Sequence, residues 1–207
     1  MLYLSIMILL LDTSTDYSIL ALAQDDELVA EYPLPVGQQS MVILPSIKGF
    51  LKCHGLAMSD LESIAIGIGP GAFTGTRIGV TIAKTLGYAL DIPLLPFCSL
   101  QALPPKPGLF VNVFNAKGGQ LYTLRGKHEN GQITYAEPTL SPLETLLDIA
   151  TDAPCISPHV ADIQAITKSH SLKWHAAQPS AYHIAKLLPT LKSTPAEAVK
   201  VLYLRIP

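Results

Sequence analysis

Hydrophobic positions in the first half of the chain follow two different periods. Short continuous apolar runs bounded by turn residues are typical of buried β-strands, whereas apolar positions that recur every three or four residues are typical of one face of a helix. The pattern predicts strands at 7–11, 18–23 and 28–32, a helix at 40–53, a strand at 63–68, a helix at 76–90 and a strand at 94–97. The predicted order is therefore βββαβαβ, a three-stranded meander followed by α/β crossovers.

The second half begins in the same way, which suggests an abridged internal duplication. Its pattern predicts strands at 109–114, 120–124 and 132–135, helices around 141–150 and 180–192, and short strands near 154–157 and 172–175. The proline-rich stretch 104–108 between the halves is typical of a connector, because proline fixes φ and lacks an N–H donor. We therefore expect an α/β protein with an N-terminal lobe at 1–104 and a smaller C-terminal lobe at 105–207.

Composition changes this picture because the chain is unusually apolar for its charge, with 49% hydrophobic and 14% charged residues, against about 25% charged in a typical globular domain. The longest apolar stretch, 1–11, contains Ser5 and is shorter than the ~18 residues of a spanning helix. It also lacks the basic region and cleavage site of a secretory signal. We expect a cytoplasmic protein without membrane contact, whose apolar excess lies in its core or under a partner protein.

A polar loop follows the first predicted strand at 12–18 and is rich in hydroxyl and carboxylate groups. Ser14, Thr15 and nearby backbone N–H groups are able to contact a phosphate, with Asp12 holding a hydrated cation. The same residue types are also ordinary in a plain hairpin, where they satisfy local backbone groups. From this loop alone, the plain hairpin is the favoured interpretation.

A second loop, at 67–77, lies between a predicted strand and a predicted helix and contains four glycines in nine residues. Such a loop permits close backbone approach, and the N-terminus of the following helix offers N–H donors to an anion. The alternative is a glycine-rich turn without a ligand. No Gly-Lys-Ser/Thr completes a Walker A loop, and the acidic residue of a dinucleotide fold is missing after the next strand. The candidate phosphate-contacting residues here are Gly69, Gly71, Thr74, Gly75 and Arg77.

The helix predicted at 76–90 carries the small residues Gly79, Ala83 and Gly87 four positions apart. A flat stripe of this kind lets another backbone approach closely. The neighbour is either the chain's own sheet or a helix of another protein, and both interpretations remain open. In the second case, the helix at 40–53, with its apolar residues Ile43, Ile47 and Phe50, is the candidate second member of the interface.

Metal and nucleic-acid signatures are weak. The six histidines form no pair at i, i+4 and no H-E-x-x-H motif, and the three cysteines have no metal-ligand spacing. The formal net charge is −2 and only three residues are arginine, which argues against an independent RNA-binding surface.

The motifs together resemble the TsaB (YeaZ) family. They are Asp12-Thr13-Ser14-Thr15 after the first strand, Ile43-Leu44-Pro45 in the first helix and the long, specific segment at 69–79. The resemblance covers residues 7 to about 125 and returns at 203–205. It implies a two-lobed actin-like (ASKHA), ribonuclease H-like fold with a reduced second lobe. It also implies a start at the equivalent of Met7, with residues 1–6 as an extension.

This resemblance implies a non-catalytic subunit in bacterial synthesis of N6-threonylcarbamoyladenosine at position 37 of tRNA. Family members pair with the paralogous transferase TsaD, and with the ATPase TsaE, so that ATP and Mg²⁺ are used by the complex and no cofactor is required by this chain. Pairing uses the first two helices, here 40–53 and 76–90, and a homodimer through the same helices is an alternative. Contact with tRNA is expected only through the complex.

Departures from the catalytic paralogue favour the non-catalytic interpretation, with no catalytic residue and no metal site. Where the paralogue carries two metal-binding histidines, the matching positions here are Gln39 and Ile43, and neither is a credible ligand in that role. At 115–117, Asn-Ala-Lys replaces the family's usual Asp-Ala-Arg, which removes a carboxylate from any cation site. The alternatives are an active ATPase or small-molecule kinase of the same fold, with Asp12 as metal anchor, and a homodimeric interaction module unrelated to tRNA.

Overall fold

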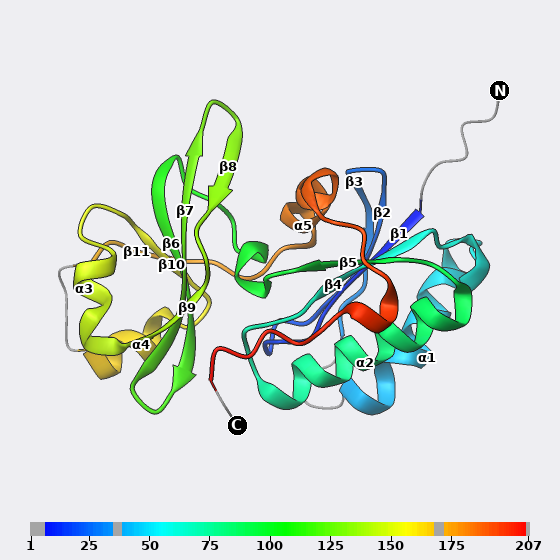
Figure 1. The fold of residues 1–207 in the computed structure, drawn as a ribbon, viewed down its shortest axis with the longest axis horizontal. Helices are drawn as coiled ribbons and strands as arrows, with labels where there is room; N and C mark the ends of the chain where they lie inside the picture. Colours follow the sequence, from blue (N-terminus) through cyan, green and yellow to red (C-terminus); the bar gives the residue numbers. More distant parts are fainter. Residues whose placement is uncertain (1–6, 35–38, 168–171, 206–207) are drawn as a thin grey trace. The chain divides into compact units, whose positions relative to one another are not determined.

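A computed structural model describes residues 7–34, 39–167 and 172–205. The chain folds into two compact units, the first formed by residues up to Ser99 with Ser180–Leu202, and the second by Leu100–Pro179 with residues from Tyr203 onward (Figure 1). The first break falls close to the expected boundary at 104. A single boundary does not describe the chain, however, because residues 180–202 return to the first unit.

The first unit is built on a five-stranded sheet in the order β3-β2-β1-β4-β5. β1 (Met7–Asp12), β2 (Ile19–Gln24) and β3 (Glu27–Glu31) form an antiparallel meander, and β4 (Ser63–Gly67) and β5 (Leu94–Phe97) continue the sheet in parallel with β1. The predicted order of strands and helices is confirmed over this half. The runs in β1, β2 and β4 are continuously apolar because these strands are buried on both faces, whereas β3 at the sheet edge alternates between exposed and half-buried residues.

Two helices, α1 (Gln39–Cys53) and α2 (Phe73–Leu90), cover one face of this sheet, and α5 (Ala181–Leu187) lies on the other side of β1–β3 (Figure 1). The core beneath α1 and α2 contains Leu9, Leu11 and Ile66 from the strands, all fully buried. α2 ends at Asp91, which adopts a left-handed conformation with φ 54° and donates its N–H to the Gly87 carbonyl.

The segment 180–202 belongs to the first unit because its contacts are made there. Thr194 bridges to Leu94 at the β5 edge, and the Leu202 N–H donates to the Ile68 carbonyl at 2.8 Å. The ammonium of Lys84 on α2 donates to the carbonyls of Glu197 and Val199 at 3.2 and 2.9 Å. Contacts between residues so far apart in the sequence cannot be predicted from local hydrophobic periodicity.

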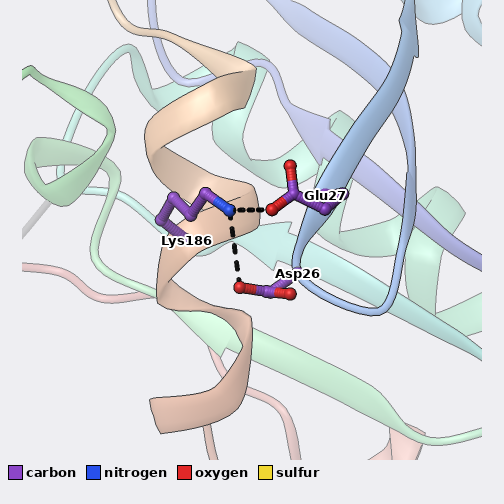
Figure 2. Close-up of polar contacts among 3 residues, drawn as sticks. All are labelled: Asp26, Glu27 and Lys186. Carbon is purple, nitrogen blue, oxygen red and sulfur yellow. Dashed lines mark hydrogen bonds and ion pairs between the residues drawn. The ribbon is translucent and has the colours of Figure 1, made fainter.

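On α5, the ammonium group of Lys186 forms ion pairs with Asp26 and Glu27 at the β2–β3 turn (Figure 2). The pair with Asp26 spans 3.5 Å. These contacts attach the returning segment to the edge of the sheet opposite β5.

The second unit is built on a six-stranded sheet, with β11-β10-β6-β7-β8 in order and β9 pairing β7. Its strands are β6 (Gly108–Lys117), β7 (Gln120–Glu129), β8 (Gln132–Tyr135), β9 (Thr139–Pro142), β10 (Cys155–Ser157) and β11 (Trp174–Ala176). The short helices α3 (Leu146–Ile149) and α4 (Val160–Thr167) contribute Leu146 and Ile163 to a core with Val111 and Val113.

One expectation for this half is wrong, and one helix was missed. The helix expected at 141–150 is the end of β9, a 3-10 turn at Leu143–Thr145 and only one turn of α-helix, because Pro142 fits the end of a strand. The helix α4 was not predicted at all. No helix in the described part of the chain has the length and hydropathy of a membrane span.

Candidate functional site

Asp12 is the last residue of β1. It lies inside the first unit and is only 4% exposed. It accepts a hydrogen bond from the Ser14 N–H at 2.8 Å. Burial raises the pKa of Asp12 above its ordinary value, and the hydrogen bond from the Ser14 N–H opposes this only in part. A carboxyl group in this position is poorly placed to hold a hydrated cation, because such a cation keeps most of its water ligands.

Glycines of the second loop make room for the first loop. A Cβ atom at Gly67 would lie 2.2 Å from the Asp12 carboxyl carbon, and one at Gly71 would lie 2.2 Å from the Ser14 carbonyl oxygen. Real Cβ atoms essentially never approach closer than 3.0 Å, so a side chain at Gly67 would displace the Asp12 carboxyl group, and one at Gly71 would require the backbone to move.

The same close packing continues along α2. A Cβ atom at Gly75 would lie 2.1 Å from the Thr13 carbonyl oxygen, and one at Gly79 would lie 2.3 Å from the Thr13 hydroxyl. That hydroxyl donates to the Gly75 carbonyl at 2.7 Å. The glycines at 67, 71, 75 and 79, which are four residues apart in the sequence, therefore all lie directly against residues 12–14. The packing of the two loops against each other was not predicted from the sequence, although the four-residue interval between the glycines is visible in it.

Several N–H donors of the glycine-rich loop are engaged by the protein itself. The Gly69 N–H donates to the Ser99 hydroxyl at 3.1 Å, and the Ala72 N–H donates to the Ser14 carbonyl at 2.6 Å. The Thr76 N–H begins the helical ladder on the Ala72 carbonyl. Each of these N–H groups thus serves folding, which a phosphate-binding loop would leave open to its ligand.

The other residues considered for phosphate contact lie apart from this buried junction. Thr15 closes a local turn, since its hydroxyl accepts the Tyr17 N–H at 3.2 Å. Thr74 and Arg77 face solvent on the first turn of α2, and the Arg77 guanidinium lies 3.6 Å from the centre of the Phe73 ring. Asp12, Ser14, Gly69, Gly71 and Gly75 are brought together, and phosphate binding there stays a prediction.

The six residues expected at a partner interface need correction. Ile43, Ile47, Phe50 and Ala83 are part of the buried core beneath α1 and α2, and Gly79 and Gly87 are also buried. A Cβ at Gly87 would meet Leu94 and Ala196 at 3.0 and 3.1 Å. Of the two interpretations of the small-residue stripe, packing within the chain is therefore the correct one.

Different residues of the same helices face solvent. Both helices connect strands that point in the same direction, so α1 and α2 run alongside each other in the same sense, and they are in contact. We call their outward surface the α1–α2 face. It consists of Met41, Leu44, Lys48 and Lys52 from α1 and Phe73, Arg77, Thr81 and Tyr88 from α2, all exposed. Met41 and Tyr88 are 79% and 84% exposed, which is unusual for large apolar side chains.

The positions that depart from the catalytic paralogue have structural roles or lie outside the described part. Ile43 is fully buried, and the side chain of Gln39 lies outside the described residues. The Asn115 amide oxygen accepts the Lys117 N–H at 2.8 Å within the β6–β7 hairpin. Among the described residues, no three His, Cys, Asp or Glu side chains gather as a metal site, while His170 lies outside them.

Comparison with known proteins was made by sequence and by structure. The family model "TsaD: tRNA N6-adenosine threonylcarbamoyltransferase" matches residues 38–189. The tRNA threonylcarbamoyladenosine biosynthesis protein TsaB of Bacillus subtilis is 37% identical over 136 residues, 63% of this chain and 59% of that protein. The Escherichia coli TsaB is 29% identical over 143 residues, 66% of this chain and 62% of that protein. The chain thus matches about three fifths of the length of these relatives.

Solved structures match over nearly the whole chain. YeaZ from Pseudomonas aeruginosa has a TM-score of 0.78 at 22% identity and covers 96% of this chain and 100% of its own. A second structure, described as similar to peptidase YeaZ from the same organism, has a TM-score of 0.77 at 23% identity, with coverages of 97% and 100%. The actin-like α/β fold class expected from the sequence is confirmed.

Proposed function

The chain belongs to the tRNA N6-adenosine threonylcarbamoyltransferase family, among its TsaB (YeaZ) members, and we propose that it is a non-catalytic subunit that pairs with a TsaD-type transferase. In this role it supports threonylcarbamoyladenosine modification of tRNA in the cytoplasm. ATP and Mg²⁺ are used by the complex, with a TsaE-type ATPase as a further partner. The chain itself requires no cofactor, and tRNA contacts the complex.

The observation that carries the non-catalytic assignment is the closed junction between the two loops. In an ATPase or kinase of this fold, Asp12 would anchor the metal and the glycine-rich loop would receive phosphate. Here Asp12 is buried, Gly67 and Gly71 lie directly against residues 12–14, and the Gly69 N–H is engaged by Ser99. A ligand would have to displace these internal contacts, so the geometry supports a structural use of both loops.

The pairing surface that we propose is the α1–α2 face. It replaces the buried residues first considered for this purpose, on the same two helices. Met41, Leu44, Phe73 and Tyr88 are each at least 44% exposed on it. Aromatic residues and methionine are enriched in protein interfaces and depleted elsewhere on protein surfaces, which supports a protein partner on this side.

Reconstitution of the modification reaction tests the proposal. The chain is combined with the TsaD-type and TsaE-type proteins of the same organism, unmodified tRNA, ATP, Mg²⁺ and the threonylcarbamoyl-adenylate donor. We expect product only when the chain and the transferase are both present, and none from the chain alone. An equal yield without the chain would refute the proposal. Turnover of ATP by the isolated chain, measured with calorimetry as a binding control, would support the ATPase or kinase alternative instead.

A further inference from the structure

Charge is distributed very unevenly over residues 1–99 of the first unit, and the α1–α2 face is the basic side of this part. Residues 1–99 contain four basic residues, and all four lie on the two helices: Lys48 and Lys52 on α1, Arg77 and Lys84 on α2. None of the nine acidic residues of 1–99 lies on either helix. The acids nearest in sequence, Asp60 and Asp91, lie beyond the helix ends.

This distribution follows no requirement of the fold. Helices are favoured by acidic residues near their N-termini and by mixed charge pairs along their exposed sides, and α1 and α2 have neither. Six of the nine acids of residues 1–99 lie instead on the β1–β3 meander and its turns, where Asp26 and Glu27 meet Lys186. Lys52, in the last turn of α1, suits the C-terminal end of that helix. The absence of acidic residues from both helices serves neither helix and points to a function at the surface.

The basic groups of Lys48, Lys52 and Arg77 on this face are exposed beside apolar side chains, whereas Lys84 is half-buried. Lys48 and Lys52 lie on the same outward side of α1 as Met41 and Leu44, because these positions recur at three- and four-residue spacing. On α2, Arg77 lies over the Phe73 ring, and Lys84 is held by the carbonyls of Glu197 and Val199. An apolar centre with charged residues around it is the usual arrangement of a protein interface.

We propose that the α1–α2 face docks a partner surface of net negative charge, and that its charge pattern disfavours a second copy of this chain on the same face. This inference rests on the proposed function and names the chemistry of the partner. In a symmetric dimer through this face, the exposed groups of Lys48, Lys52 and Arg77 would oppose the same three positive groups of the second copy. An acidic surface on the transferase would be attracted at a distance and held in register.

A nucleic acid is the other polyanion to consider, and the face suits it less well. Phosphate recognition needs clustered lysine and arginine side chains that are free to reach the backbone. Here Lys84 donates to two carbonyls, Arg77 lies on a ring, and the centre is formed by Met41 and Leu44, which offer phosphate nothing. A protein with an acidic rim around an apolar patch fits these groups better.

Charge reversal tests this inference with a matched control. The variant Lys48→Glu/Lys52→Glu changes the face, and Lys192→Glu/Lys200→Glu makes the same change in net charge at exposed positions of the C-terminal segment. Binding to the TsaD-type transferase of the same organism is measured by calorimetry at low and high NaCl. We expect the first variant to weaken binding about tenfold at low salt and the control to change it less than twofold. High salt should weaken the unmodified complex several-fold and reduce the difference.

Self-association of the chain is a second, independent measurement, and the same variant is expected to strengthen it while weakening transferase binding. Sedimentation of the chain alone should show that Lys48→Glu/Lys52→Glu strengthens dimerisation, because the face then carries both signs of charge. Transferase binding that is independent of salt, or weakened equally by both variants, would overturn the electrostatic inference while the pairing proposal stands. No transferase binding at any salt would refute both. Binding of unmodified tRNA by the chain alone, abolished by the first variant only, would assign the face to nucleic acid and overturn the inference.

Discussion

Substitution of Gly75 by alanine is the most direct test of the buried junction between the two loops. In an ordinary helix, Gly→Ala stabilises by about 0.5–1 kcal/mol, because alanine loses less conformational freedom on folding. At Gly75 the added Cβ would lie 2.1 Å from the Thr13 carbonyl oxygen, whereas ordinary contacts begin at 3.4 Å. The obstacle is backbone rather than a flexible side chain, so the loop or the helix has to move by more than 1 Å.

The expected magnitude follows from these opposing terms. Overpacking of a dense interior costs about 1–3 kcal/mol. The shift also strains the hydrogen bond from the Thr13 hydroxyl to the Gly75 carbonyl, a group that contributes about 1 kcal/mol. After the helix-propensity gain is subtracted, Gly75→Ala should lower the free energy of unfolding by about 2 kcal/mol, which is a fall in Tm of roughly 4–8 °C for a chain of this size.

Gly49 provides the matched control, because it lies in the interior of α1 with nothing within 4 Å of an added Cβ. Gly49→Ala should leave stability unchanged or raise it by up to about 1 kcal/mol. Urea unfolding followed by circular dichroism gives the global values, and hydrogen exchange of residues 7–24 and 73–90 locates the effect. If Gly75→Ala were as stable as Gly49→Ala, with unchanged exchange in both segments, the close packing of the two loops would be refuted.

Three further predictions concern ionisable groups. Burial raises the pKa of the Asp12 carboxyl above 3.8 in the folded state, so protonation of this group favours folding. The stability that protonated Asp12 contributes is complete at low pH and is lost as the pH rises through the raised pKa. Asp12→Asn should therefore flatten the pH dependence of the urea midpoint between pH 4 and 8. Lys186→Ala should lower Tm slightly more than Lys192→Ala at low salt, because it removes the ion pairs with Asp26 and Glu27 (Figure 2). These pairs are exposed, so at 0.5 M NaCl, where the screening length is roughly 4 Å, the two variants should have the same Tm. A difference that persists at high salt would contradict this. Iodoacetamide should label the exposed Cys53 in the folded chain and should label Cys155 only after unfolding, because burial raises the pKa of the Cys155 thiol to about 12. Mass spectrometry of the peptides measures the labelling of each cysteine.

The first unit was predictable from the sequence because its signals are local. Continuous apolar strands and helices with a clear period each bury one defined set of side chains, so element type and order follow from the pattern. The helix boundaries were not predicted as well. α2 begins at Phe73, three residues before the predicted start, and its first turns carry Arg77, which stacks on the Phe73 ring. A cation stacked on a ring is a side-chain contact, and hydrophobic periodicity does not register it.

The second unit was less predictable because its elements are short. α3 has four residues and β10 and β11 have three each, which is too few for a period to be measured. Their identity is decided by what they pack against, such as Ile163 against Val111 in the core. The return of 180–202 to the first unit depends likewise on hydrogen bonds to Ile68 and Leu94, which are far away in sequence.

Glycine-rich loops that bind phosphate and glycine-rich loops that pack against backbone look alike in sequence, and the contacts of the glycines separate the two cases here. A phosphate loop needs glycine where the backbone turns and leaves its N–H groups open. In this chain Gly67 ends β4 and Gly71 lies in the loop, whereas Gly75 and Gly79 lie one turn apart on the same side of α2. All four glycines lie directly against residues 12–14, so they serve the packing of this neighbouring segment. The same interval continues at Ala83 and Gly87, which are buried within the unit. This side of α2 is therefore used for folding along its whole length, and only its outward side, with Arg77 and Tyr88, remains for a partner.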